Sequence, residues 1–549
     1  MIRAKFLRAV AAVAIAVGLA PAVAACGGSS VGAADASPAV GDGPIALVAR
    51  VPLGAGAIDA LPARSWAVSF DVRLPPASRL QVGLGYRGAP LTLSSAGSGV
   101  RVVVPHGGAY TLTRMPGWLG GGWWHVEATN ARMSIDGRSL PVPSSAATTI
   151  TFGVERGRPQ VDALIATPSA DRGMLLLHRL AELHARIPPR QFPIGATAAD
   201  SIVYGSSYWT TGFWPGALWQ AAAIAPQDGL FARWALTATL EHFGREHADT
   251  HDVGFMYGES SLAAWLALCQ GPSAAPPASA ATCARLKRSV LAAADELRAL
   301  AAGNPGAGTI PTDATSAQAD TIVDSMMNIQ ILPWASRVTG DPAYAKLAAH
   351  QAQVIAQLLV RPDGSTAQAV NLDRATGRVV SIATHQGLSS TSTWSRGEGW
   401  AVYGFAQAAI DLRDRGLLRV AVRTADYVAS HLPPGAIPLW DYDAPAGAPV
   451  DVSAGVITAA GLFHLATACR ALAGVCSSDS SRWVALGRRM LAAGLGRASD
   501  QPPLGLLGSQ VLDEREESCW CNGGELSFGL TYALEGLQLE AASGGRQRR

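Results

Sequence analysis

Residues 385–412, HQGLSSTSTWSRGEGWAVYGFAQAAIDL, join a polar cluster to a helix. The polar part, His385–Trp400, combines an imidazole, an amide, an arginine, two indoles and several hydroxyls. The part that follows has apolar residues at helical spacing, so the cluster lies where a loop enters a helix. Arginine binds a carboxylate through two parallel hydrogen bonds, and tryptophan faces stack on sugar rings. The stretch therefore predicts a helical fold with a pocket for a sugar acid.

Helical periodicity continues in both directions from this stretch, and we expect a helical domain over residues 170–541 with a disordered tail at 542–549. The apolar faces recur in pairs and the polar motifs fall at alternate junctions between helices, which is typical of an (α/α)6 barrel. Twelve candidate helices begin near Asp171, Thr211, Leu230, Glu259, Ala284, Thr321, Pro342, Arg396, Leu417, Val452, Ser480 and Gly524.

Residues 45–168 show a different pattern, with short β-like runs between Gly, Pro and Ser turns. Asp136-Gly137 reads as a tight turn between two of these runs. We expect a smaller antiparallel β-sandwich that resembles the concanavalin-type or laminin-G-like folds. The expected strands lie near 66–74, 81–86, 100–104, 123–128 and 148–154. We expect Trp118, Trp123 and Trp124 to pack in the core or at an interdomain contact. The alternative is that they form a surface on which a sugar stacks.

Charge and composition exclude some functions. The 549 residues include 49% hydrophobic and 15% charged residues, with a net charge of +2. Lysine occurs only at positions 5, 287 and 346, so no basic stripe is available to neutralise phosphates, and nucleic acid is not expected as a partner. The sequence makes no prediction of oligomeric state.

The N-terminal residues have the layout of a signal peptide. Three basic residues precede the apolar run Ala9–Leu19, and Val23–Gly27 resembles a bacterial lipobox around Cys26. We expect residues 1–26 to direct export, Cys26 to be lipidated and residues 27–44 to form a flexible linker. The alternative is ordinary secretion after cleavage near Ala24. The expected location is the cell envelope or outside the cell, with membrane contact only through the lipid.

The other six cysteines form three sequence-local pairs, as expected in an oxidising compartment. No cofactor is predicted, and no metal either, because the histidines and cysteines lack metal-ligand spacing. The pairs are Cys269 with Cys283, Cys469 with Cys476, and Cys519 with Cys521.

Two aspartates are the candidate catalytic residues. Asp324 lies in the apolar run TIVDSMMN, where burial would raise its pKa and keep it protonated as a general acid requires. Its alternative role is that of an acid at the start of a helix or of a buried hydrogen-bond anchor. Asp252, in HDVGFMY, either holds a turn or helps to keep a nearby acid protonated.

The expected substrate contacts come from three stretches. Arg396 is expected to bind a substrate carboxylate, with an ion pair to Glu398 as the alternative. Of Trp209, Trp214 and Trp219, we expect Trp209 to reach the pocket and the others to pack in the core. His251 and His385 are more typical of hydrogen-bonded structural residues.

The motifs HDVGF, IVDSMMN, RPDGST, HQG and STWSRGEGWAVYGF together resemble glycoside hydrolase family 88, the unsaturated glucuronyl hydrolases, over about residues 200–540. The resemblance implies an (α/α)6 barrel that removes 4,5-unsaturated uronic acid from the non-reducing end of lyase-generated oligosaccharides. It places the catalytic acid on Asp324 and the assisting aspartate on Asp252. Contacts to the unsaturated sugar fall on Gln386, Arg396 and Trp400, and His251 joins the expected pocket.

The chain departs from the family pattern after RPDGST, where relatives commonly have Tyr-His and this chain has Ala367-Gln368. Gln368 is polar but cannot become cationic, so we expect it to bind substrate with a changed preference. Two alternatives remain open. One is an unsaturated rhamnogalacturonyl hydrolase acting on pectin fragments, and the other is an impaired surface protein that binds carbohydrate.

Overall fold

The computed structural model describes strands between Ala46 and Pro168 and most of residues 176–544. The gaps within 176–544 are 178, 182, 185–186, 197–201, 206–208, 227–228, 271–277, 473, 477–479, 498–506 and 513–523. Cys26, the lipobox, Trp118 and the Cys519–Cys521 pair lie outside the described residues.

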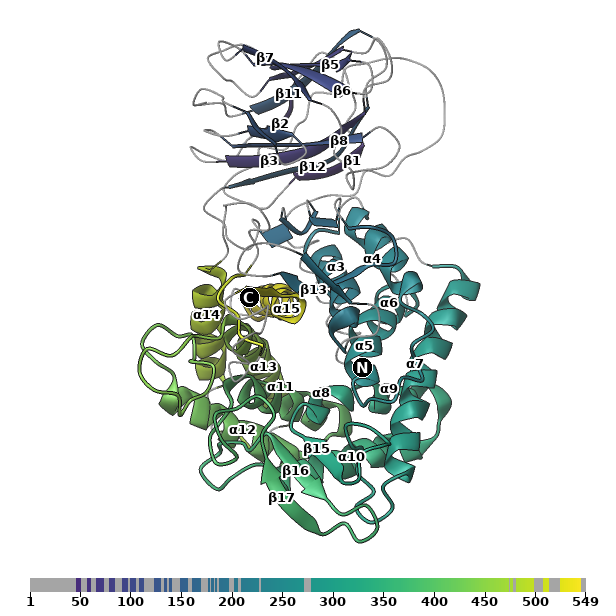
Figure 1. Cartoon of the computed structure of the whole chain (residues 1–549), viewed down its shortest axis with the longest axis vertical. Coiled ribbons are helices and arrows are strands. Elements are labelled where there is room, and N and C mark those ends of the chain that lie inside the picture. Colours follow the sequence, from purple (N-terminus) through teal and green to yellow (C-terminus); the bar gives the residue numbers. More distant parts are fainter. Residues whose placement is uncertain are drawn as a thin grey trace.

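The strands before residue 169 form two six-stranded antiparallel sheets, which lie as two layers in Figure 1. Their antiparallel pairing confirms the strand pattern expected from the sequence, including the hairpin around 136–137, where Ile135 pairs with Arg138. The resemblance to concanavalin-type folds and the domain boundaries stay predictions. One sheet runs β1 (Ala46–Arg50), β12 (Gln160–Pro168), β3 (Trp66–Arg73), β8 (Trp123–Thr129), β9 (Met133–Ile135), β10 (Arg138–Leu140). The other runs β2 (Ala57–Ala60), β11 (Thr149–Arg156), β4 (Arg79–Gly83), β5 (Leu91–Ala96), β6 (Gly99–Val104), β7 (Gly108–Leu112).

Alternation of side chains explains why these residues form sheets. Leu80, Leu93 and Val102 face one another across β4, β5 and β6, and all three are fully buried. Gln81, the next residue along β4, is only partly buried. A period of two residues therefore separates the buried from the more exposed face, as in a sheet with one apolar side.

The helical half closes into a ring of inner helices, each of which contacts the next. Contacts run from α3 to the α5–η2–α6 segment, on to α8, α11, α13 and α15, and from α15 back to α3. This closed ring is the predicted (α/α)6 barrel. The inner elements are α3 (Phe213–Ile224), α5 (Val253–Tyr257), η2 (Gly258–Leu262), α6 (Ala263–Leu268), α8 (Ser325–Asn328), α9 (Ile331–Thr339), α11 (Ser395–Leu412), α13 (Val452–Ala471) and α15 (Ser527–Gly544).

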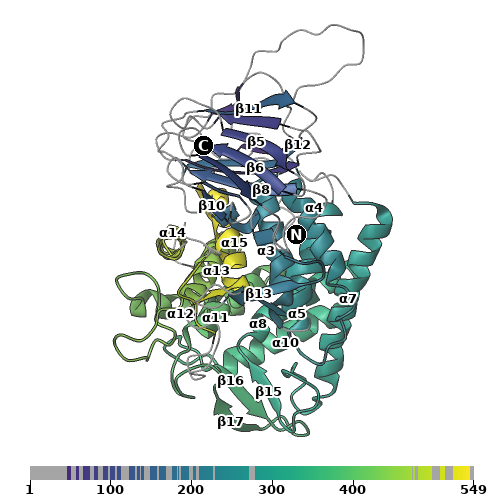
Figure 2. The ribbon, with the colours of Figure 1, turned by 45° about the horizontal axis from the view of Figure 1, so that its top comes forward.

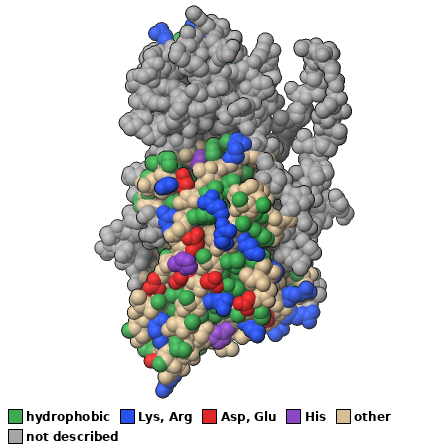
Figure 3. All heavy atoms as spheres, turned by 90° about the vertical axis from the view of Figure 1, so that its right-hand side faces the viewer, with side chains coloured by type: hydrophobic (Ala, Val, Ile, Leu, Met, Phe, Trp, Pro, Cys, Tyr) green, Lys and Arg blue, Asp and Glu red, His purple; other side chains and the backbone are tan. Residues whose placement is uncertain are grey.

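Outer helices pack against the ring, and five of them are described in full. Figure 2 shows α7, α12 and α14 at the periphery of the barrel. Acidic and basic side chains are interspersed on the side of the molecule drawn in Figure 3, without a field of one sign. The outer helices are α4 (Leu230–Glu241), α7 (Ala280–Ala302), α10 (Pro342–Leu358), α12 (Arg415–His431) and α14 (Ser481–Leu495); residues 176–184 are also helical where described.

Side-chain caps fix where several helices begin. Ser279 accepts a hydrogen bond from the backbone N–H of Thr282 at the start of α7, and Asp341 accepts one from Ala343 at α10. Asp414 and Asp451 cap α12 and α13 in the same way. Such caps satisfy backbone donors that have no partner within the helix.

Two predicted helix starts are wrong in position. The helix expected from Glu259 already begins at Val253 and continues through the π-helical turn η2. The helix expected from Thr321 is preceded by strand β15 (Ala319–Ile322), so Asp324 lies in the turn between strand and helix. The β-branched residues of the strand explain the difference, because they pair with β16 instead of continuing the helix.

Two three-stranded sheets were not predicted. One has the order β14-β13-β18 and the other β15-β16-β17. Their strands are short and lie in the loops between inner and outer helices, where periodicity gives little signal. The bounds are β13 (Phe192–Ala196), β14 (Ile202–Gly205), β18 (Glu525–Leu526), β16 (Ala369–Leu372) and β17 (Val379–Ala383).

Two of the predicted disulfides are formed, Cys269–Cys283 and Cys469–Cys476. Helix α13 is long and apolar enough to cross a membrane by composition, but 94% of its apolar window is buried in the structure. Its apolarity is explained by its place in the inner ring, between α11, α14 and α15.

Candidate active site

The predicted site residues meet at the N-terminal ends of the inner helices. Asp252 precedes α5, Asp324 precedes α8, and Arg396 lies in the first turn of α11. Trp209 belongs to the 3-10 turn η1 (Trp209–Gly212) that leads into α3. Because each loop enters its helix at the same end of the barrel, residues far apart in sequence converge there.

Asp324 is a buried carboxyl group with a raised pKa at this end of the barrel. It is 7% exposed, and its Oδ2 is buried with no hydrogen-bond partner among the described residues. Burial raises its pKa to about 6; the charge of Asp252 raises it too, while His251 and Arg396 act in the opposite direction. A carboxyl group with this pKa is partly protonated near neutral pH and can donate a proton.

Asp252 and His251 form a hydrogen-bonded group beside Asp324. The Nε2 of His251 lies 3.3 Å from Oδ1 of Asp252, and its Nδ1 lies 3.0 Å from Oγ of Ser325. Asn328 donates from Nδ2 to Oδ1 of Asp252 at 3.3 Å, and its Oδ1 accepts from the backbone N–H of Phe255. The group ties the loop before α5 to the first turn of α8.

Ser325 and Asn328 were not singled out from the sequence as site residues. Asn328 was visible as a polar residue in the apolar run TIVDSMMN, four positions after Asp324. On a helix this spacing places both residues on one face, which was the available signal.

Arg396 is completely buried and is already bonded. Its Nη1 donates to Oδ2 of Asp451 at 3.1 Å and to the carbonyl of Val511, and its Nη2 donates to the carbonyl of Leu512 at 2.8 Å. The guanidinium also lies 4.5 Å above the ring of Trp394. The structure therefore does not present Arg396 at an open surface, and its ion-pair partner is Asp451 rather than Glu398.

Gln386 meets Arg396 at a single acceptor. Its Nε2 donates to the carbonyl oxygen of Leu512 at 3.0 Å, the oxygen that also accepts from Arg396. Two donors, one from the loop before α11 and one from the first turn of α11, thus point at one backbone oxygen. Asp451 was not singled out from the sequence, and its pairing with Arg396 was missed.

Gln368 organises the loop rather than facing an open pocket. It is 3% exposed, and its Oε1 accepts hydrogen bonds from Thr384 Oγ1 and from the backbone N–H groups of His385 and Gln386. Its backbone carbonyl accepts from the N–H of Val323, the neighbour of Asp324. The expectation of direct substrate contact does not match these partners, because the acceptor side of the amide is fully used within the loop. His385 is half-exposed, with Nε2 2.7 Å from Asp320.

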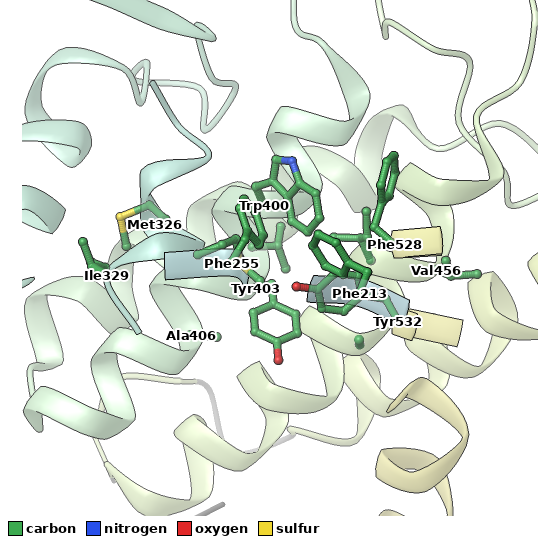
Figure 4. Packing of buried hydrophobic residues seen from close by; sticks show 14 of the residues in the cluster. Phe213, Phe255, Met326, Ile329, Trp400, Tyr403, Ala406, Val456, Phe528 and Tyr532 are labelled. Carbon is green, nitrogen blue, oxygen red and sulfur yellow. The ribbon is translucent and has the colours of Figure 1, made fainter. Parts of the chain in front are cut away.

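The candidate tryptophans differ in exposure: Trp209 is partly exposed and forms the rim of the site, and the others are buried. Trp214 and Trp219 are buried, as expected, whereas Trp209 is partly exposed and stacks on Phe528 with ring centroids 5.3 Å apart. Trp400 is fully buried among Phe255, Phe528 and Tyr532 (Figure 4). Stacking of a sugar on its face is therefore not supported, but its Nε1 has no hydrogen-bond partner among the described residues and remains a possible donor.

Glu398, in the first turn of α11, is a second buried carboxyl group at this end of the barrel. Burial raises the pKa of Glu398 to about 8, and its Oε2 accepts from Oγ1 of Thr366 at 2.8 Å. Among the described residues no three His, Cys, Asp or Glu side chains are placed to hold a metal ion. Asp324 and Asp252 together offer a partly protonated carboxylic acid beside a second carboxyl group.

No model of a known protein family matches the chain. Individual proteins do match. An unsaturated glucuronyl hydrolase of Bacillus sp. (strain GL1) is 31% identical over 289 residues, covering 50% of this chain and 72% of the relative. One from Formosa agariphila is 29% identical, covering 50% and 68%. An unsaturated chondroitin disaccharide hydrolase of Streptococcus pyogenes serotype M1 is 28% identical, covering 46% and 61%.

Solved structures support the same assignment of the barrel. An unsaturated glucuronyl hydrolase specific for heparin superposes with a TM-score of 0.61 at 24% identity, covering 68% of this chain and 97% of that one. The enzyme from Bacillus sp. GL1 gives a TM-score of 0.57 at 25% identity, covering 67% and 94%. The chain belongs to the unsaturated glucuronyl hydrolases, glycoside hydrolase family 88.

Proposed function

We propose that this protein is a glycoside hydrolase that releases 4,5-unsaturated uronic acid from the non-reducing end of oligosaccharides left by polysaccharide lyases. The observation that carries the proposal is the buried Asp324 with a pKa of about 6, beside Asp252 at the N-terminal end of the barrel. The relatives that match the chain are named for hydrolysis of unsaturated glucuronyl and chondroitin disaccharide substrates.

The reaction is a hydration of the double bond. The protonated Asp324 gives its proton to C4 of the vinyl ether, and positive charge develops at C5 and the ring oxygen. Water adds to C5 while the Asp324 carboxylate takes a proton from it. The hemiketal at C5 then opens and releases the rest of the saccharide from C1. One acid that gives and regains a proton is sufficient, so the rule that relates carboxylate separation to stereochemistry does not apply.

Asp252 assists by its charge. A second carboxylate near Asp324 disfavours ionisation of the acid, so the proton is retained until substrate is bound. His251, Ser325 and Asn328 hold Asp252 in place through the bonds described above. We assign them positioning roles.

The substrate carboxylate is proposed to take the place of the Leu512 carbonyl. Arg396 and Gln386 already converge on that oxygen, at 2.8 and 3.0 Å, and a carboxylate oxygen offers the same acceptor with a full negative charge. Several inner helices also point their positive N-terminal ends toward this region, which favours an anion. Trp209 is proposed to contact the saccharide from the rim.

Absorbance of the conjugated double bond tests the activity directly. Unsaturated disaccharides from chondroitin, heparin, hyaluronan, gellan, ulvan and pectin are incubated with the protein and with Asp324→Asn. Loss of the absorbance with the wild-type protein alone supports the proposal. If no substrate is consumed but disaccharides still bind, the chain is a carbohydrate-binding protein, and turnover confined to pectin fragments would make it a rhamnogalacturonyl hydrolase.

We also propose that the protein is exported and anchored through a lipid on Cys26. Support comes from the basic and apolar residues that precede Cys26 and from the disulfides Cys269–Cys283 and Cys469–Cys476, which fit an oxidising compartment. In cells fed a labelled fatty acid, the wild-type protein should be labelled and sediment with membranes. The Cys26→Ala variant should be neither labelled nor found with the membranes. Equal labelling of the wild-type protein and the variant would rule the anchor out.

A further inference from the structure

A second hollow lies at the opposite end of the inner helices. It measures about 780 Å³, including its opening to solvent, and its walls come from α3, α6, α11, α13 and α15 with the turn η2. These residues lie one to three turns beyond the helix starts that form the candidate active site. The lining residues that matter are Trp219, Glu259, Gln407, His464, Glu535 and Leu539.

Phe255, Trp400, Tyr403 and Tyr532 form an aromatic layer within the inner ring (Figure 4). Phe255 and Trp400 lie on the side of the candidate active site, and Tyr403 and Tyr532 lie below them, with Trp400 and Tyr532 5.3 Å apart. The hydroxyl of Tyr403 donates to Glu535 at 2.8 Å, and that of Tyr532 to Glu259 at 3.2 Å. The hollow therefore begins where the aromatic layer ends.

The polar part of the wall includes the carboxyl groups of Glu259 and Glu535 and the amide of Gln407. Glu259 and Glu535 are each 6% exposed, and each accepts a hydrogen bond from a tyrosine hydroxyl. Gln407 is 3% exposed, and its Oε1 is buried with no hydrogen-bond partner among the described residues. Its Nε2 donates to Asp411 at 2.8 Å, which fixes the orientation of the amide because a carboxylate can only accept.

Positive charge in this wall is already paired. The one basic side chain among the described lining residues is His464, whose Nε2 lies 3.2 Å from Oε1 of Glu535. In the adjoining hollow, which shares Gln407 and Leu266, Arg337 lies 3.5 Å from Asp411. The rest of the wall combines the polar residues Gln220, Thr467 and Gln538 with apolar ones such as Ala223, Ala263 and Ala267.

We propose that this hollow is a binding site for a small organic cation that carries an ammonium group on an apolar body. The ammonium would donate to the Gln407 amide oxygen and to the Glu535 and Glu259 carboxylates, and the apolar body would cover the alanine and leucine wall. A buried acceptor without a partner is costly, so a donor supplied by a ligand is favourable there. An anionic uronate is repelled, so the site is not a second substrate pocket.

Calorimetry with three probes of equal shape tests the charge preference. Cyclohexylammonium is expected to bind about tenfold more tightly than cyclohexanol, and cyclohexanecarboxylate is expected not to bind. Binding of cyclohexylammonium should survive in Asp324→Asn, which separates this site from the catalytic one. Equal affinities for the three probes, or no binding of the ammonium, would overturn the proposal.

Two variants place the ligand within the hollow. Ala267→Trp fills the wall and should abolish binding, whereas Ala349→Trp, a half-buried residue of α10 that lines none of the hollows in the described part of the chain, should leave it unchanged. Glu535→Gln should weaken binding about tenfold. Binding that persists in Ala267→Trp would place the cation elsewhere and contradict the proposal.

Discussion

The two ends of the inner helix ring carry opposite chemistry on the same helices. At the N-terminal end, Asp324 is kept partly neutral by burial, and the donors Arg396 and Gln386 converge on one oxygen. At the C-terminal end, acceptors such as Glu535 and Gln407 line the wall. In this barrel the two ends of the inner helices therefore differ, with a convergent pair of donors at the N-terminal end and carboxyl and amide acceptors at the C-terminal end.

The aromatic layer between the ends keeps the two environments apart. Trp400, Tyr403 and Tyr532 are fully buried and pack against one another, so water cannot pass readily between the ends. A carboxyl group above the layer can hold a raised pKa while carboxylates below it remain hydrogen-bonded. A substitution at one end of the ring should therefore affect mainly the chemistry of that end.

The largest expected effect is on catalysis at the N-terminal end. Asp324→Asn removes the proton that C4 must receive, and kcat should fall by about 10³-fold with little change in KM. Glu398→Gln is a matched control, because it makes the same change in another buried carboxyl group of raised pKa. A comparable loss of kcat in Glu398→Gln, or a fully active Asp324→Asn, would contradict the assignment of Asp324 as the catalytic acid.

The next largest effect is on stability. Arg396→Ala leaves Asp451 as a buried carboxylate without its ion-pair partner, which should lower the free energy of unfolding by about 3 to 4 kcal/mol. Denaturant unfolding measures the change. Adding Asp451→Asn should recover part of the loss, since the amide carries no charge; a double variant no more stable than Arg396→Ala would show that the carbonyl contacts of Arg396 dominate.

Asp324 should also cost stability at neutral pH. Its pKa is about 6 in the folded protein, against an ordinary value of 3.8, so the unfolded chain releases the proton first as pH rises. The resulting destabilisation is absent well below pH 3.8, grows between about pH 4 and 6, and is constant above that, at about 3 kcal/mol at most. Asp324→Asn should therefore be more stable than wild type at pH 7.5 and not at pH 3.5. A difference that does not depend on pH would assign the effect to packing.

The smallest effect is expected at the rim. Trp209→Ala removes a partly exposed ring that stacks on Phe528, and KM should rise by about three- to tenfold while kcat changes little. Trp219→Ala, a change at a buried residue in the middle of α3, is the comparison: it should destabilise the fold without raising KM. Equal KM effects from both tryptophans would show that the rim is not specific to substrate.

Much of the fold could be predicted because long helices carry strong signals. The starts expected at Leu230, Pro342 and Val452 coincide with α4, α10 and α13. At Pro342 and Val452, a capping aspartate and the periodicity agree. The short strands β15 and β16 could not be predicted, because four-residue runs are too short for a period to show. Asp324 was consequently placed within a helix when it lies before one.

The chemistry of the site was easier to predict than its contacts. Asp324 was recognisable as a carboxyl group in an apolar run, and the structure buries it as expected. The partners of Arg396 were not predictable, because Asp451 and Leu512 are brought to it only by the closure of the ring. The hydrogen bonds of Gln368 were also not predictable. Its sequence neighbours do not show that its amide oxygen accepts from residues 384–386, so it was expected to contact the substrate instead.

The pH dependence of kcat/KM in wild type and Asp252→Asn tests the central claim most directly, because it reports the pKa of the acid in the free enzyme. In the wild type, kcat/KM should decrease as the pH rises above about 6, which gives the pH profile a falling limb. In Asp252→Asn this limb should move to lower pH, since a neighbouring negative charge that raises the pKa of Asp324 has been removed. A falling limb that stays in place, or one that persists in the residual activity of Asp324→Asn, would show that another group supplies the proton.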